Sequence, residues 1–302
     1  MTVQRNPSPI RSEFCSEVSR ESGEPLGATA SHVEHWLLVE YRGAWAYDPV
    51  AGSTLSPEVR SHLSAQVAAR PRSRLLFVRR PDRRGHDRLA CFYARTSEVE
   101  PLLRRFDLDS HEDLLEIDFH ADEGRRLEHP LFTVCTHGKR DRCCARYGRP
   151  LYDALRELAE EDRVWQSTHV GGDRFAGNLL CFPDGLYFGR VGTGDVWQVL
   201  DEYLAGRIDL EHYRGRSCYP FAVQAAERAV RVATERTGVR DLRLLSAERR
   251  EARRWRVAFA VGDDVIDVDV ATERGELTYL TCTAEAAKHP LRFTATLEVP
   301  AR

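Results

Sequence analysis

Short apolar runs alternate with polar stretches along the N-terminal part of the chain. Continuous or alternating apolar runs indicate strands, and apolar positions three or four residues apart indicate helices. On this basis residues 33–41 are predicted to form a strand, and residues 57–67 a helix. Residues 74–78 and 88–93 are predicted to form a strand pair joined by a polar loop, and residues 98–105 a short helix.

The middle of the chain shows a different order of elements. A buried strand is expected to end at Cys135, and a Pro183-Asp184-Gly185 turn is expected to join two strands as a hairpin. The predicted strands are 129–134, 164–170, 175–182 and 186–191, and the predicted helices are 150–160 and 196–204. This β-α-β-β-β-α order favours a small α/β domain with a mixed sheet, since it has too few crossovers for an all-parallel one.

The last third of the chain reads as a helix that covers an antiparallel sheet. The predicted helix is 220–237, and the predicted strands are 242–245, 255–261, 265–270, 277–282 and 293–299. We therefore divide the chain into an N-terminal α/β region (1–127), a central α/β domain (128–215) and a C-terminal α+β region (216–302). No internal repeat is visible in the sequence.

Composition narrows the class of protein. The chain has 302 residues, of which 30% are charged, and a net charge of −3, which argues against a nucleic-acid binder. Its first residues lack the apolar core of a signal peptide, and no apolar run is long enough to span a membrane, so we expect a cytoplasmic protein without a membrane partner. Three of the eight cysteines fall within ten residues, which in a reducing compartment favours metal binding or redox chemistry.

The most informative stretch runs from Cys135 to Asn178. It contains the spacing Cys135-x8-Cys144-x24-His169-x3-Asp173. Thiolates together with an imidazole suit an iron–sulfur cluster or zinc. A structural zinc site usually uses cysteine pairs only two to four residues apart. The longer step from Cys135 to Cys144 predicts a loop that wraps around something larger than a single ion.

These motifs resemble those of a known family. The segments CTHGKRDRCC and HVGGDRFAGNLLCFPDGLYFGRV are similar to the sucrase/ferredoxin-like family of thioredoxin-like [2Fe–2S] proteins. The resemblance extends to FCS at 14–16, GATA at 27–30 and RGRS at 214–217. It implies a thioredoxin-like central domain that carries a [2Fe–2S] cluster. In eukaryotic relatives a C-x8-C step and an H-x3-H step hold the cluster, so the resemblance implies Cys135, Cys144 and His169 as ligands.

The chain departs from this pattern at the fourth ligand. Asp173 stands where the family pattern has histidine, and we predict that its carboxylate completes the set. Cys143 is a close alternative, and His137 is a weaker one. The remaining cysteines are expected to be small core residues; they are Cys15, Cys91, Cys181, Cys218 and Cys282.

Charged residues surround the motif. Arg140, Asp141 and Arg142 are candidates for ordering the loop, and Arg174 and Arg190 for balancing the charge of a cluster. In each case a role on the solvated surface is an open alternative.

The sequence favours a one-electron carrier that exchanges electrons with redox partner proteins. The chain shows no G-x-G-x-x-G motif for a nicotinamide or flavin and no carboxylate pair poised for sugar hydrolysis, so an enzymatic activity of its own is not indicated. Two alternatives stay open. One is a thiol–disulfide oxidoreductase that uses Cys143-Cys144 or Cys135, and the other is a zinc-stabilised binding module. The sequence does not predict an oligomeric state.

Overall fold

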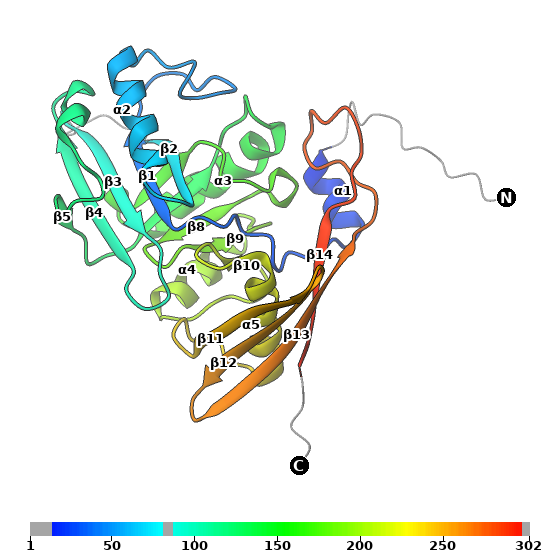
Figure 1. The fold of residues 1–302 in the computed structure, drawn as a ribbon. Coiled ribbons are helices and arrows are strands. Elements are labelled where there is room, and N and C mark those ends of the chain that lie inside the picture. The colour runs from blue at the N-terminus through cyan, green and yellow to red at the C-terminus, as the bar shows by residue number, and fades with distance from the viewer. Residues whose placement is uncertain (1–13, 81–86, 298–302) are drawn as a thin grey trace.

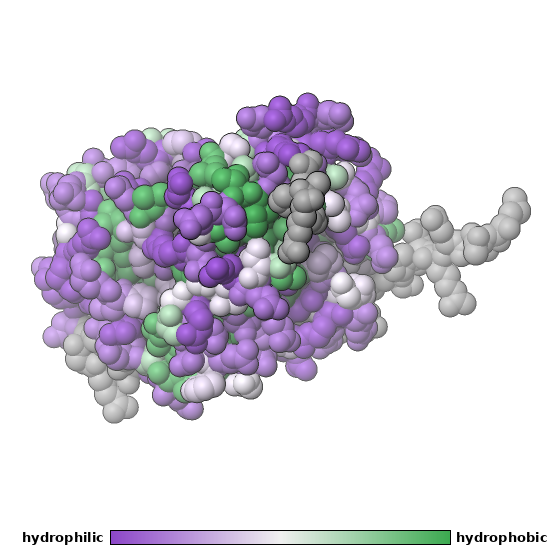
Figure 2. Space-filling view, turned by 90° about the horizontal axis from the view of Figure 1, so that it is seen from below, coloured by the Kyte–Doolittle hydropathy of each residue, from purple (hydrophilic) through white to green (hydrophobic). Residues whose placement is uncertain are grey.

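The computed structural model describes residues 14–80 and 87–297. One large sheet forms the body of the molecule, and a smaller sheet with its own helix packs at one end (Figure 1). The surface seen from below is mostly hydrophilic, with hydrophobic patches between the polar side chains (Figure 2). Among the described residues, no helix is long and apolar enough to cross a membrane.

The central part of the chain forms a βαβ unit followed by a hairpin and a helix. Its elements are β6 (Leu131–Cys135), α3 (Arg142–Leu158), β7 (Val164–Ser167), β8 (Leu179–Phe182), β9 (Leu186–Phe188) and α4 (Val196–Leu204). Strand β6 runs parallel to β7 and antiparallel to β8, and β8 pairs antiparallel with β9. The resulting order β9-β8-β6-β7 is that of a thioredoxin-like domain, which confirms the predicted fold.

The N-terminal part repeats this arrangement. Its elements are β1 (His35–Glu40), α2 (Pro57–Ala68), β2 (Ser73–Arg79), β3 (Leu89–Arg95), β4 (Leu102–Leu108) and the 3-10 turn η1 (Glu112–Glu116). Strand β1 is parallel to β2 and antiparallel to β3, and β3 is antiparallel to β4, so the order β2-β1-β3-β4 matches that of the centre. The sequence pattern did not reveal this repeat.

The two halves meet edge to edge. Strands β2 and β7 pair antiparallel through Val78 with Ser167 and Arg79 with Gln166. With β5 (Arg125–Arg126) and β10 (Tyr213–Arg216) at its edges, the sheet reaches ten strands. One hydrophobic core cluster contains residues of both halves, among them Trp36, Phe92 and Trp165.

Several predictions for local structure are wrong. The helix predicted over 150–160 is α3, which begins at Arg142, so Cys143 and Cys144 lie inside it. Strands β2 and β3 are not neighbours, because β1 lies between them; residues 81–86 of the loop that was predicted to join them lie outside the described residues. Residues 98–105 were predicted to form a helix, but residues 102–108 form strand β4. Leu103 and Phe106 are buried where β4 pairs with β3. The predicted strand 277–282 is a loop with one isolated bridge, between Thr278 and Lys288.

The C-terminal part forms the helix-covered sheet that the pattern predicted. Helix α5 (Phe221–Thr234) packs on the antiparallel strands β11 (Leu242–Glu251), β12 (Arg254–Val261), β13 (Asp264–Arg274) and β14 (Leu291–Leu297). Near the other end of the chain, the short helix α1 (Cys15–Glu21) lies beside the loop between β13 and β14 (Figure 1).

A buried charge network joins α5 to the edge of the large sheet. Glu227 Oε1 accepts hydrogen bonds of 3.1 Å from both Nε and Nη2 of Arg231, and Glu227 Oε2 accepts one of 2.9 Å from Tyr213. Arg216 lies 3.9 Å from the same carboxylate. The positive charges of two buried arginines are therefore compensated by the one carboxylate of Glu227.

We expect Glu227→Ala to lower the free energy of unfolding by about 3–5 kcal/mol, because it leaves buried arginines without a counter-charge. The measurement is urea denaturation of the purified protein. Asp153→Ala is the matched control, since Asp153 pairs with Arg149 on the surface and its loss should cost under about 1 kcal/mol. Equal effects of the two substitutions would contradict the role given to Glu227.

Candidate metal centre

The centre is built where β6 ends and α3 begins. Strand β6 ends at Cys135, and the chain then turns through residues 136–141 into the helix. Asp141 is the N-cap of α3, and its Oδ1 accepts a 2.8 Å hydrogen bond from the backbone N–H of Cys143. Cys144 therefore lies in the first turn of the helix, where the free N–H groups and the helix dipole favour a thiolate.

The structure brings three of the predicted ligands together. The Sγ atoms of Cys135 and Cys144 and a ring nitrogen of His169 all lie within 4.8 Å of one another. Both cysteines are buried, whereas the His169 side chain keeps 24% of its surface exposed. The imidazole is thus the part of this group that reaches solvent.

Asp173 lies against two of these three side chains, Cys144 and His169. Its Oδ1 is 3.3 Å from Sγ of Cys144 and 2.9 Å from Nδ1 of His169, and its side chain is 3% exposed. It is placed by η3 (Asp173–Phe175), a short 3-10 turn that follows Gly171 and Gly172. Both glycines have positive φ, +98° and +80°, a region that side chains with a Cβ rarely adopt.

The electrostatics of the group favour a single thiolate, that of Cys135: the hydrogen bond with Cys135, together with burial, raises the pKa of Cys144 well above its usual range. Hydrogen bonding by the Cys144 thiol, helped by His169, lowers the pKa of Cys135 well below its usual range. Burial opposes the charge of His169, but the Asp173 carboxylate and the Cys135 sulfur outweigh it and raise the pKa of His169 to about 9.

The donor set fits a bound iron or zinc species. It consists of two sulfurs, an imidazole nitrogen and a carboxylate oxygen, a combination that either metal accepts. Among the described residues, Nδ1 of His169 has no hydrogen-bond partner of good geometry, although it is buried and faces Asp173. A metal-bound species at this place would give that nitrogen a partner.

The two alternative ligands lie elsewhere. Sγ of Cys143 lies 3.3 Å from Sγ of Cys282 and 3.5 Å from Sγ of Cys15. His137 Nε2 contacts the carbonyl oxygen of Ala46 at 2.8 Å, and its ring packs edge-on against Trp45. Consecutive residues Cys143 and Cys144 thus belong to two different groups of side chains.

Arg214 is a charged residue of the site that the sequence analysis did not name as a candidate. It is fully buried in β10, and its Nη1 donates to Oδ1 of Asn178 at 2.7 Å and to the carbonyl oxygen of Gly171 at 3.1 Å. Burial lowers its pKa to about 10, and Asp173 and Cys135 are among the groups that favour its charge. In the sequence only the RGRS resemblance marked this position, because β10 is joined to the site through the sheet.

Arg174 and Arg190, the candidates for balancing charge, hold the N-terminal segment. Arg174 Nε donates to both carboxylate oxygens of Glu24, at 2.8 and 2.9 Å. Arg190 Nη2 donates to Ser19 and to the carbonyl oxygen of Glu24. These contacts fix the segment that follows α1 against the loop that carries Asp173.

Comparison with known proteins places the chain in a family. Residues 26–215 match the model of the family described as sucrase/ferredoxin-like. The chain belongs to the sucrase/ferredoxin-like family. The match includes Cys135, Cys144, His169, Asp173 and Arg214, and it excludes α1 and the whole C-terminal sheet.

Curated relatives match a shorter stretch. The protein called altered inheritance of mitochondria protein 32 from Meyerozyma guilliermondii is 31% identical over 103 residues, which are 31% of this chain and 36% of the relative. Its counterpart from Debaryomyces hansenii is 31% identical over 110 residues, 33% of this chain and 39% of the relative. The match thus spans less than half the length of these relatives.

Solved structures also match the chain in part. A thioredoxin-like [2Fe–2S] ferredoxin from Aquifex aeolicus aligns at 19% identity and a TM-score of 0.28, covering 31% of this chain and 97% of that one. A cysteine-to-serine variant of that ferredoxin aligns at 19% identity and a TM-score of 0.26, covering 28% and 97%.

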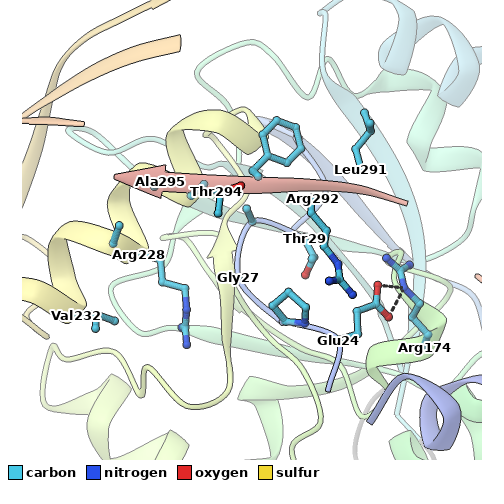
Figure 3. Close-up of a pocket in the computed structure, with 15 residues that line it drawn as sticks. Glu24, Gly27, Thr29, Arg174, Arg228, Val232, Leu291, Arg292, Thr294 and Ala295 are labelled. Atoms are coloured by element: carbon cyan, nitrogen blue, oxygen red, sulfur yellow. Dashed lines mark hydrogen bonds and ion pairs between the residues drawn. The ribbon is translucent and has the colours of Figure 1, made fainter. Parts of the chain in front are cut away.

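A pocket of about 420 Å³ lies near the metal centre, but the proposed metal ligands do not line it. Segment 24–29, α5 and β14 line it, and Glu24 meets Arg174 at one end (Figure 3). None of the four predicted ligands contributes to its wall. The pocket and the centre are therefore separate. Two residues of the pocket wall lie next to the centre: Arg174, which follows Asp173, and Thr29, which accepts hydrogen bonds from Arg214.

We expect Gly148→Ala to disturb the centre from inside α3. A Cβ at Gly148 would overlap the carbonyl oxygen of Cys135, so the helix start that carries Cys144 must shift away from the end of β6. Such overpacking typically costs about 1–3 kcal/mol, and it should lower metal content as well. Urea denaturation and metal analysis measure the two effects.

Gly194→Ala is the matched control for this substitution. A Cβ at Gly194 meets no described atom within 4 Å, so stability and metal content should stay close to those of the unchanged protein. A Gly148→Ala protein with unchanged metal content would show that the close approach of helix and strand does not position Cys144.

Proposed function

We propose that this protein is an iron–sulfur electron carrier, with one [2Fe–2S] cluster held by Cys135, Cys144, His169 and Asp173. The observation that carries the proposal is the convergence of Cys135, Cys144 and His169 within 4.8 Å of one another, with Asp173 in contact with Cys144 and His169. Membership of a family described as sucrase/ferredoxin-like supports it independently. When bound, the cluster supplies one-electron redox chemistry at a potential that histidine ligation raises above that of all-cysteine clusters.

The side chains around such a centre have different roles. Cys135, Cys144 and Asp173 are buried and exclude water, which protects bound sulfide and iron. His169 alone is partly exposed, so electrons would enter and leave on its side. Arg214 places a buried positive charge behind the centre and offsets part of the negative charge of thiolates and sulfides.

A cationic groove gives access to His169. It has a volume of about 460 Å³, and its wall includes Arg74, Arg140 and His169, with Asp48 as the one acidic residue of the described lining. The Arg140 guanidinium stacks on Tyr47, and Arg74 Nη1 donates to the carbonyl oxygen of Val170. Both cations are therefore held beside the exposed imidazole. We propose that the redox partner is a protein that presents acidic side chains to this groove.

The thiol–disulfide alternative that uses Cys143 and Cys144 is less well supported, because the two thiols face different groups. The form that uses Cys135 shares its thiol with the proposed cluster, so iron and sulfide content separates the two. A zinc-stabilised module uses donors of the same kind, so only the identity of the bound metal separates it from the carrier.

The first test is the visible spectrum and the iron and sulfide content of protein purified without air. We expect about two irons and two sulfides per chain, with visible absorption that one-electron reduction bleaches. Cys144→Ala should lose all three, because it removes a buried thiolate ligand. Cys218→Ser is the matched control, since Cys218 is a half-buried cysteine outside both thiol groups. A colourless protein with zinc in place of iron would contradict the proposal.

Substitutions of Asp173 test the fourth ligand. Asp173→Ala should lower cluster content severalfold, because it leaves one coordination position without a protein donor. Asp173→His creates the H-x3-H step of the eukaryotic pattern, and we expect it to keep the cluster with shifted absorption bands. If Asp173→Ala retains the full cluster and an unchanged spectrum, the carboxylate is not a ligand.

A further inference from the structure

A second group of thiols lies on the other side of the α3 N-terminus. Cys15 begins α1, Cys143 is in the first turn of α3, and Cys282 lies in the loop between β13 and β14. The sequence analysis assigned Cys15 and Cys282 to the core as small residues. Cys15 is buried and Cys282 is half-buried, but the two are not isolated, because both lie against Cys143. The separations of 128 and 139 residues from Cys143 hid the group from any local motif.

The three sulfurs form a compact triangle. Cys143 Sγ lies 3.3 Å from Cys282 Sγ and 3.5 Å from Cys15 Sγ, and the third side, between Cys282 and Cys15, measures 3.6 Å. Four sulfurs placed tetrahedrally at the usual zinc–sulfur distance would lie about 3.8 Å apart. The triangle is therefore close to the face of a tetrahedral metal site.

Asp141 supplies a fourth donor. Its two carboxylate oxygens each lie 3.9 Å from Cys15 Sγ, and all four donor atoms lie within 4.8 Å of one another. Its oxygens also accept the backbone N–H groups of Cys143, at 2.8 Å, and of Cys282, at 2.7 Å. The carboxylate is 1% exposed and fixed in place by these hydrogen bonds.

A disulfide does not account for this arrangement. A disulfide needs two sulfurs about 2.05 Å apart, and a triangle would leave the third thiol unpaired. The three near-equal separations favour no pair over another.

Hydrophobic packing does not account for it either. The local cluster of buried apolar residues holds only Cys15, Cys143 and Ala176, with Phe14, Tyr147 and Cys282 packed against it. A buried carboxylate at the centre of so small a cluster is costly unless it is paired. A divalent cation would compensate both the carboxylate and the thiolates.

We propose that Cys15, Cys143, Cys282 and Asp141 bind a single zinc ion, at a site distinct from the iron–sulfur centre. The three sulfur–sulfur separations of 3.3–3.6 Å match one face of a tetrahedron around a single ion, and zinc accepts both thiolate sulfur and carboxylate oxygen as ligands. Cys15 and Cys282 lie outside residues 26–215, so the family match does not contain this site. The inference does not depend on the proposed function.

The ion would fasten three segments that are distant in sequence. It would clamp α1 and the β13–β14 loop to the start of α3, in addition to the hydrogen bond that the N–H of Cys282 donates to Asp141. Because Cys143 is followed by Cys144, the zinc site would also steady the helix turn that carries a ligand of the first centre.

Metal analysis of the full chain, expressed with zinc and iron supplied, tests the proposal. We expect about one zinc per chain in the unchanged protein. Cys15→Ser and Cys282→Ser should each lower zinc at least tenfold while iron and the visible spectrum persist. Cys144→Ala should do the opposite, keeping zinc and losing iron. Cys218→Ser should change neither metal.

Cobalt binding to the unchanged protein tests the zinc site without any variant, and so does not depend on how well a variant folds. The purified protein is stripped of zinc with a chelator and titrated with Co²⁺, and we expect intense sulfur-to-cobalt absorption with one equivalent, displaced by Zn²⁺. Unchanged protein without zinc and without this absorption would overturn the proposal. So would zinc content that both serine variants retain, or a single iron found in place of zinc. Loss of iron alone would count against the electron carrier and leave the zinc site standing.

Discussion

The hydrogen bonds that the Asp141 carboxylate accepts determine the arrangement of both groups of thiols. One oxygen caps α3 through the N–H of Cys143, and the other holds the backbone of Cys282. The cap determines where the helix begins, and therefore which way its first two cysteines face: Cys143 outward to Cys15 and Cys282, and Cys144 inward to Asp173. Burial raises the pKa of this carboxyl to about 7, with the charge of Asp173 as a further cause. A positive charge nearby would relieve both effects.

The sequence pattern predicted several elements well, although it placed the start of α3 eight residues too late, at 150. Helix α4 was predicted with its observed bounds, and α2 within a residue, because Ser56 caps α2 and Pro57 begins it. The hairpin of β8 and β9 followed from its Pro-Asp-Gly turn. Residues 98–105 were misassigned as a helix because leucines and arginines suit a helix as well as a strand, and only pairing with β3 decides between them.

The candidate centre was predictable in part for the same reason. The four proposed ligands stand in two short motifs, so their spacing along the chain is enough to group them. Arg214 and the second thiol group could not be found this way. Arg214 reaches the site through the sheet, and Cys15 and Cys282 approach Cys143 from opposite ends of the chain. Contacts of this range arise from tertiary packing, which leaves no periodic trace in one sequence.

The seam between the two thioredoxin-like halves reaches the residue next to the centre. Beyond the paired residues of β2 and β7, the N–H of Thr168 donates to the carbonyl oxygen of Phe77, and Thr168 Oγ1 accepts from the N–H of Phe77. Thr168 directly precedes His169. The N-terminal half thus holds in place the backbone that carries the imidazole. It also pairs with β7, which would otherwise be an exposed edge strand of the sheet. A fragment cut at residue 128 would keep the order of a thioredoxin-like fold and lose the support that aims its one exposed donor.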